Sequence, residues 1–274
     1  MSAANCPETP RQKMISMMYI VLTAMLALNV STDVLNGFSL VQESLSKTIE
    51  STEIKNKDLY EQFGALKSQN PKKVGEWLDL ANTVKAKTDS LYGVIETLKY
   101  DIVKAADGEE ADVNNIQGKD NLDVSAQVAL PSGVIPQNQR GVILKNDLNK
   151  YRDYMISLVK DSAKQEAFKQ TFNTEDRIVN GDPMSWENAR FSSMPVSATI
   201  TLLTKIQADL RNTESEVVSY LKNQVDASDF RVNKIEALVL PTSNYVIRGD
   251  KYSAKIVLSA VDSTKIPEIF IGEN

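Results

Sequence analysis

Four carboxylates lie close together near the middle of the chain, at Asp107, Glu109, Glu110 and Asp112. Clustered carboxylates are the ligands that Ca²⁺ prefers, so the segment raises the question of a calcium site. Their spacing does not match the ligand positions of an EF-hand loop, and a solvated acidic turn accounts for them more simply. We therefore predict no metal site in this segment.

Groups that could support other chemistry are scarce. The chain has no histidine and one cysteine, Cys6. This composition excludes Cys/His zinc sites, Cys/His nucleophile pairs and Ser-His-Asp triads. We expect neither enzymatic activity nor a cofactor. A net charge of −5 also makes nucleic acid a poor partner.

An uncharged apolar run from Met14 to Thr32 follows Arg11 and Lys13. As a helix it would be about 28 Å long at roughly 1.5 Å per residue, close to the ~30 Å core of a bilayer. A cleaved signal peptide, a buried core helix and a retained transmembrane helix are the three interpretations. Residues 24–27 (AMLA) make a poor cleavage site, and the apolar pattern continues past them. We expect a transmembrane helix over residues 14–35.

The flanking charges predict the orientation of this helix. Arg11 and Lys13 precede it, whereas the first basic residue after it is Lys47. The positive-inside rule then makes residues 1–13 cytoplasmic and the body periplasmic, in the inner membrane of a bacterium. Cys6 would lie in the reducing cytoplasm. It precedes the apolar run, which argues against a lipoprotein signal, and the body has no cysteine for disulfides.

The run itself holds no Asp, Glu or His. A proton relay across a membrane needs an ionisable group at depth, so this chain alone cannot carry one. Its polar residues include Thr23 near the middle and Asn29 near the outer edge. We expect the Ser and Thr hydroxyls to bond back to their own helix.

Beyond the run, helical spacing of apolar residues predicts a helical bundle domain over residues 36–225. The first helix is expected to continue outward from the membrane to about Ser68, and Asn70-Pro71 to restart the chain as N-cap and first helical residue. The next helix has a heptad-like stripe, with Lys99 suited to its C-terminal end. Two further helices are expected, over about 141–172 and 196–225. Four such stripes favour a four-helix bundle, so the fold class is mainly α.

The pattern changes at residue 226. Short β-rich runs at 235–240, 245–247 and 252–261 alternate with turn residues. About three strands cannot close a sandwich, and the sequence stops in mid-pattern. We therefore expect residues 226–274 to be the opening of a truncated, periplasmic β-sandwich-like domain. The tripeptide Arg248-Gly249-Asp250 matches a cell-adhesion motif, but here it is interpreted as a hairpin turn.

The N-terminal strings resemble those of one family. Residues 9–19 (TPRQKMISMMY), 22–31 (LTAMLALNVS) and 33–38 (DVLNGF) closely resemble the start of the gliding-motility protein GldM, called PorM in non-gliding relatives. The predicted order of one span, a helical periplasmic domain and β domains agrees with that family. Beyond about residue 40 the resemblance is one of architecture.

The resemblance implies an inner-membrane subunit of the Bacteroidetes type IX secretion and gliding machinery. Such subunits are homodimers whose two transmembrane helices sit inside a ring of GldL (PorL) subunits with membrane-buried carboxylates. Proton flow through that complex would turn the subunit, and its periplasmic shaft would reach outer-membrane components through distal β domains. This chain lacks the further β domains, which puts those outer contacts in doubt.

The resemblance also implies a role for Arg11, because the family's matching arginine is thought to pair with a buried glutamate of the L subunit. A positive-inside charge on lipid phosphate is the simpler alternative, and Lys13 fits that ordinary role. We expect a transmembrane interface with the partner formed by Arg11, Met14, Met18, Tyr19, Thr23 and Asn29.

Two other function classes stay open. A one-span sensor with a helical ligand-binding domain would need a cytoplasmic signalling domain, for which the residues before Arg11 leave no room. A passive tether without energy coupling is poorly separated from a motor by sequence.

Overall fold

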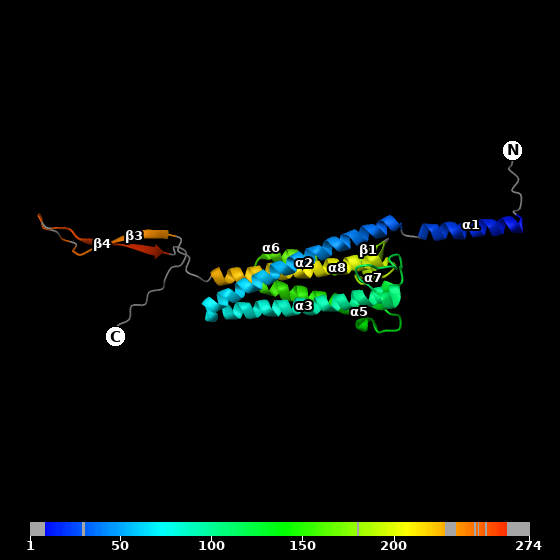
Figure 1. The fold of residues 1–274 in the computed structure, drawn as a ribbon, viewed down its shortest axis with the longest axis horizontal. Coiled ribbons are helices and arrows are strands. Elements are labelled where there is room, and N and C mark those ends of the chain that lie inside the picture. The colour runs from blue at the N-terminus through cyan, green and yellow to red at the C-terminus, as the bar shows by residue number, and fades with distance from the viewer. Residues whose placement is uncertain are drawn as a thin grey trace, which may run out of the picture. The chain divides into compact units, whose positions relative to one another are not determined.

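A computed structural model shows the fold (Figure 1). The structure describes residues 9–28, 31–179, 181–227, 234–243, 245, 247–249 and 251–261. Contacts divide the chain into two compact units, residues 1–220 and 221–274, which are described separately.

The first helix, α1, spans Pro10–Leu28, and every described side chain on it is exposed. Within the described part of the chain, no helix has the combined length and apolarity that crossing a bilayer requires. The transmembrane helix expected over residues 14–35 therefore stays a prediction.

The described residues do not form one continuous first helix, because a second helix, α2, begins anew at Thr32 and runs to Gln69. Ser31 precedes it in a non-helical conformation, and its Oγ accepts a hydrogen bond from the backbone N–H of Asp33. This serine cap and the acidic Asp33 in the first turn stabilise a helix start. Gly37 lies inside α2 and does not interrupt it.

Helix α3, Pro71–Asp107, returns along α2 after a tight corner. Pro71 takes the first helical position, as predicted. Asn70 occupies the N-cap position, but its side chain makes no capping bond. Its backbone N–H instead closes the end of α2 on the carbonyl of Leu66.

The predicted third helix is two helices, because Val159 adopts an extended conformation after α5 (Arg140–Leu158). Val159 is buried, so packing favours the break, and Asp161 caps α6 (Ser162–Thr171) by accepting from the N–H of Ala163. The remaining elements of this unit are η1 Gly108–Glu110, α4 Val124–Ala129, η2 Pro136–Asn138, β1 Arg177–Val179, β2 Asp182–Met184, α7 Asn188–Phe191 and α8 Val196–Ala227.

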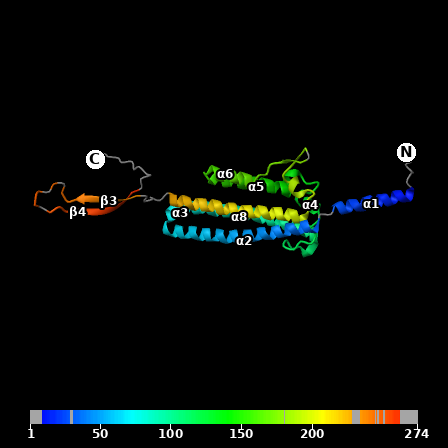
Figure 2. The same ribbon diagram turned by 90° about the horizontal axis from the view of Figure 1, so that it is seen from above.

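Helices α2, α3, α5 and α8 lie lengthwise against one another (Figures 1 and 2). The pairing of Phe38 with Thr201 and of Asn56 with Arg211 shows that α2 and α8 run in the same direction. Helix α3 runs against both. The segment between α5 and α8, which contains α6, returns the chain to the starting end, so the bundle is not a simple up-down-up-down arrangement.

Strict seven-residue spacing defines the buried seam of this bundle. Its members are Leu35, Gln42, Ile49, Asn56 and Phe63 on α2, Val74, Ala81, Thr88, Ile95 and Ile102 on α3, and Ile200, Gln207 and Glu214 on α8. A heptad repeat keeps one stripe facing its neighbours over the whole helix length. The seam is not wholly apolar, because five of these positions carry polar side chains.

The second unit contains an antiparallel hairpin of β3 (Lys234–Pro241) and β4 (Ala254–Val261), paired from Lys234↔Val261 to Pro241↔Ala254. The expected middle strand at 245–247 is wrong, because Tyr245 and Ile247 belong to the connection between β3 and β4. Arg248 and Gly249 form a turn with Gly249 at φ +108°, as interpreted from sequence, and Asp250 lies outside the described residues.

Candidate functional site

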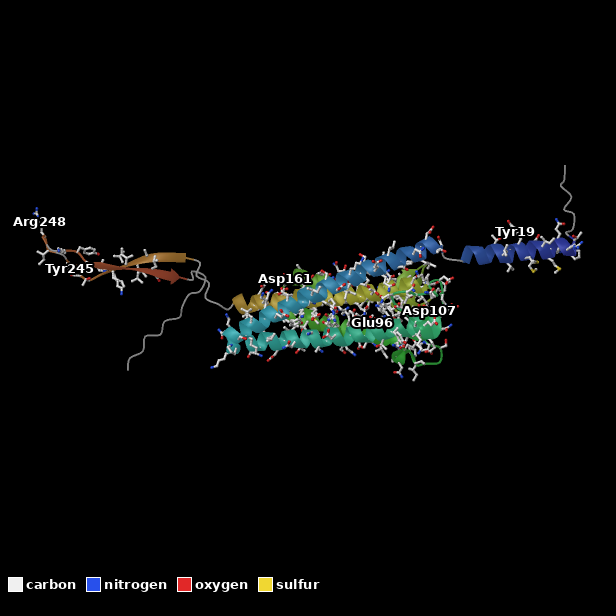
Figure 3. The ribbon with its side chains drawn as sticks, viewed as in Figure 1. Tyr19, Glu96, Asp107, Asp161, Tyr245 and Arg248 are labelled. Atoms are coloured by element: carbon white, nitrogen blue, oxygen red, sulfur yellow. The ribbon has the colours of Figure 1, made fainter. Side chains whose placement is uncertain are left out.

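The predicted partner interface lies on α1. Arg11, Met14 and Met18 share one helix face by their spacing, and Tyr19 and Thr23 form the adjacent strip. All five are exposed, and Figure 3 shows Tyr19 pointing away from its helix. The sixth predicted residue, Asn29, lies outside the described residues. No contact in the structure tests this interface, so it stays a prediction.

The hydroxyl of Thr23 is satisfied within α1. Its Oγ1 donates to the carbonyl of Tyr19 over 2.5 Å. This local bond is the one expected for Ser and Thr in a helix surrounded by apolar residues. Thr23 therefore needs no partner to satisfy its hydrogen-bonding groups.

The acidic segment after α3 is a folded loop held by Asp107, which Figure 3 labels at the end of the bundle. Its carboxylate accepts from the backbone N–H groups of Gln117 and Gly118 over 2.8 and 2.7 Å. Asp112 accepts from the N–H of Asn114, and Glu109 is exposed. In the described residues, no group of three or more potential ligands could hold a metal. Asp107 thus acts as a loop clamp.

A set of charged and polar side chains crosses the bundle at mid-length, and we call it the polar layer. It consists of Glu53, Asn56 and Tyr60 on α2, Asp89 and Tyr92 on α3, and Arg211 and Glu214 on α8.

Arg211 is the centre of the polar layer. Its Nε donates to Glu53 over 3.0 Å, and its Nη1 donates to Asp89 over 2.6 Å and to Glu214 over 3.1 Å. The guanidinium also stacks on the ring of Tyr92, 4.7 Å from its centroid. One side chain therefore joins all three helices. Although burial opposes it, hydrogen bonding and charge from Asp89 and Glu214 raise the pKa of Arg211 above its ordinary value.

Glu214 is the most buried member, with 1% of the residue exposed. It accepts hydrogen bonds from Tyr60 at 3.0 Å and from Asn56 at 3.3 Å, in addition to Arg211. Burial raises the pKa of Glu214 above its ordinary value, although Arg211 and Tyr60 oppose the shift. Burial of its phenol likewise raises the pKa of Tyr60, which keeps this hydroxyl protonated.

A second polar contact lies between α3 and α8. Gln207 donates to Glu96 over 2.8 Å and accepts from the ammonium of Lys99 over 2.9 Å. Lys99 was expected to serve the helix end, but only 6% of it is exposed. Burial lowers the pKa of Lys99 below its ordinary value, against the pull of Glu96.

Helix α5 joins the same region through Tyr151. Its hydroxyl lies 3.0 Å from the hydroxyl of Thr88 on α3 and donates to the carbonyl of Leu210 on α8. All four long helices are therefore linked by polar contacts near the polar layer. Such buried polar groups fix the register of packed helices, because a shift by one turn would leave them without partners.

Sequence reasoning missed the polar layer, yet a signal for it was present. The apolar stripe expected on the last helix jumps from Leu210 to Val217, and Glu214 occupies the intervening position of the same face. Asn56 similarly stands midway between Ile49 and Phe63 in the stripe of α2. Trp186 and Phe191, in contrast, are large apolar residues of the segment between α6 and α8, and both are buried, as their hydrophobicity favours.

Comparison with known families gives two matches. Residues 33–224 match the family model for the GldM N-terminal domain. Residues 226–274 match the model for the GldM second domain. No curated protein matches the chain. The two matched segments cover most of the chain, including the whole polar layer.

Proposed function

The chain belongs to the GldM family, and we propose that it is a motor subunit of the type IX secretion and gliding machinery, driven by the proton-motive force. The family is a component of that machinery, anchored in the inner membrane with its body in the periplasm. The observation that carries the proposal is the match to both GldM domains over residues 33–274.

The proposed division of work follows from the N-terminal segment. The run from Met14 to Thr32 has no Asp, Glu or His, so the titrating acid must belong to a partner. We propose a GldL-like multi-span protein with a membrane-buried carboxylate as that partner. Arg11, at the cytoplasmic edge of the proposed span, is the residue of this chain that would pair with the acid.

The bundle is suited to carrying the resulting motion. Helix α2 is about 57 Å long at ~1.5 Å per residue, and the polar layer ties it to α3 and α8. Cross-linked helices resist sliding past one another, so force applied at one end reaches the other without being lost in internal shear. We propose that the chain works as a homodimer and that further β domains carry the contact to outer-membrane components.

Co-purification tests this proposal. The chain is produced in a bacterium that makes the machinery and isolated from membranes in mild detergent, and the stoichiometry of bound proteins is measured. We expect two copies of this chain with a larger number of copies of one multi-span protein that has an acidic residue within a span. Recovery of the chain alone, or as a monomer with its partner, would contradict a motor. A sensor would instead co-purify with a cytoplasmic signalling protein.

A further inference from the structure

A polar pocket away from the polar layer gathers three cations from separate elements. Its volume is about 440 Å³, and α6, β1, α7 and α8 contribute to its wall. The lining residues are Gln170, Thr171, Asn173, Glu175, Asp176, Arg177, Arg190 and Lys205. We call it the arginine pocket.

The two arginines of this pocket lack carboxylate partners among the described residues. Within the described parts of the chain, neither Arg177 nor Arg190 forms an ion pair. Burial, and then the neighbouring charge of Arg177, lower the pKa of Arg190 below its ordinary value. Two guanidinium groups that line one pocket repel each other, and an anion bound in that pocket would relieve the repulsion.

Arg190 is held in place by its surroundings. Its guanidinium stacks on Trp186, 4.4 Å from the ring centroid, and only 2% of Trp186 is exposed. The backbone N–H of Trp186 donates to Asp176 over 3.0 Å, which fixes the loop before α7. The donor groups of Arg190 are therefore preorganised, and binding an anion would cost little side-chain entropy.

The other charges of the pocket are already engaged, with one exception. Asp176 accepts from Lys145 over 2.8 Å, and Lys205 donates to Asp209 over 2.5 Å. The exception is Glu175, whose carboxylate meets only the side-chain amide of Asn173, over 3.3 Å, among the described contacts. Glu175 therefore places one negative charge at the wall, opposing any anion that enters.

We propose that the arginine pocket binds a doubly charged oxyanion, namely a phosphate group that is free or carried on a lipid headgroup. A dianion would neutralise both arginines at once. Guanidinium groups offer paired donors that match phosphate oxygens, and the amides of Gln170 and Asn173 can supply further donors. A volume of about 440 Å³ leaves room for a substituent on the phosphate.

Titration calorimetry with inorganic phosphate tests the proposal on the whole chain in a non-ionic detergent at low ionic strength. Arg190→Gln should weaken binding by about tenfold or more, because it removes a charge-assisted contact. Glu175→Gln should tighten binding, because it removes the opposing charge. Arg140→Gln is the matched control, since it removes an equal charge from an arginine paired with Asp101. The control should bind as the wild type does.

Circular dichroism establishes whether each variant is folded. If Arg190→Gln does not fold, Arg177→Gln takes its place, because Arg177 is exposed. Absence of phosphate binding to the wild type would overturn the proposal. So would equal losses in Arg190→Gln and Arg140→Gln, or no gain in Glu175→Gln.

Vesicles of phosphatidylcholine with and without phosphatidic acid then identify the source of the phosphate. If phosphatidic acid increases vesicle binding more for the wild type than for Arg190→Gln, the phosphate that the pocket binds belongs to a lipid headgroup. If phosphatidic acid increases vesicle binding equally for both proteins, and the wild type binds inorganic phosphate, the pocket binds a free phosphate compound.

Discussion

The hydroxyl of Tyr60 on α2 donates to the buried carboxylate of Glu214 on α8 over 3.0 Å. The same hydroxyl oxygen lies 3.2 Å from the carbonyl of Ala81 on α3. A hydroxyl has one proton, so it can serve only one of these acceptors at a time. If Glu214 is protonated, it can donate to Tyr60, and the Tyr60 proton is then free for Ala81.

This relationship predicts a dependence of stability on pH. Because the pKa of Glu214 is raised in the folded state, the folded protein binds more protons than the unfolded chain at pH values between the two pKa values. The contribution of Glu214 to the unfolding free energy is then fully present below its ordinary pKa and is lost as the pH rises through the folded pKa. The unfolding free energy is measured by urea unfolding at a series of pH values. Across this window its slope against pH should differ between the wild type and Glu214→Gln. Equal slopes of the unfolding free energy against pH in the two proteins would contradict a raised pKa of Glu214.

Removing the central cation of the polar layer should be costly. Arg211→Met leaves Glu214 buried next to Asp89 without its counter-charge, and breaking a buried pair in this way typically costs about 3–5 kcal/mol. The unfolding free energy in urea measures the loss. Arg140→Met removes a half-exposed pair with Asp101 and should cost about 1 kcal/mol or less. Equal losses in the two variants would show that Arg211 is an ordinary surface charge.

Replacement of Lys99, unlike that of Arg211, should not lower the stability of the bundle. Its burial already disfavours the charged form, and Gln207 keeps a hydrogen bond to Glu96 when the ammonium is removed. Lys99→Met should therefore leave stability within about 1 kcal/mol of the wild type or increase it. Thermal unfolding followed by circular dichroism checks this, and a loss as large as that of Arg211→Met would refute it.

The start of α5 should not accept a methyl group. A Cβ on Gly141 would lie 2.9 Å from a methyl carbon of Leu130 and 3.2 Å from the ring of Phe191. Gly141→Ala is expected to destabilise the bundle by about 1–3 kcal/mol through overpacking. Gly93→Ala is the control, because the space around Gly93 is open and alanine favours helix. Gly93→Ala should add about 0.5–1 kcal/mol to the unfolding free energy. The two variants should therefore shift the melting temperature in opposite directions.

Periodicity was sufficient to predict the long helices, because the buried positions of α3 from Val74 to Ile102 repeat every seven residues. Periodicity failed where a single residue begins or ends a helix within a continuous apolar stripe. Ser31 caps a new helix inside an apolar pattern, and Val159 leaves the helix to pack in the core. Neither event changes the spacing of apolar residues, so only the folded contacts reveal it.

The polar layer was missed for a related reason. A glutamate in the sequence gives no sign of its partners, and those of Glu214 lie on α2, far away along the chain. The arginine pocket is also a tertiary feature, because Arg177, Arg190 and Lys205 come from three separate elements.

The central claim is that Arg11 takes part in proton-driven motion, and replacing it tests this most directly. Cells carrying Arg11→Ala are compared with cells carrying Lys13→Ala, with immunoblots to establish equal protein levels, and both gliding and protein secretion are measured. We predict that Arg11→Ala abolishes both activities, while Lys13→Ala, which removes the same charge two residues later, largely retains them. Wild-type gliding and secretion in Arg11→Ala cells, or equal losses in the two variants, would contradict the claim.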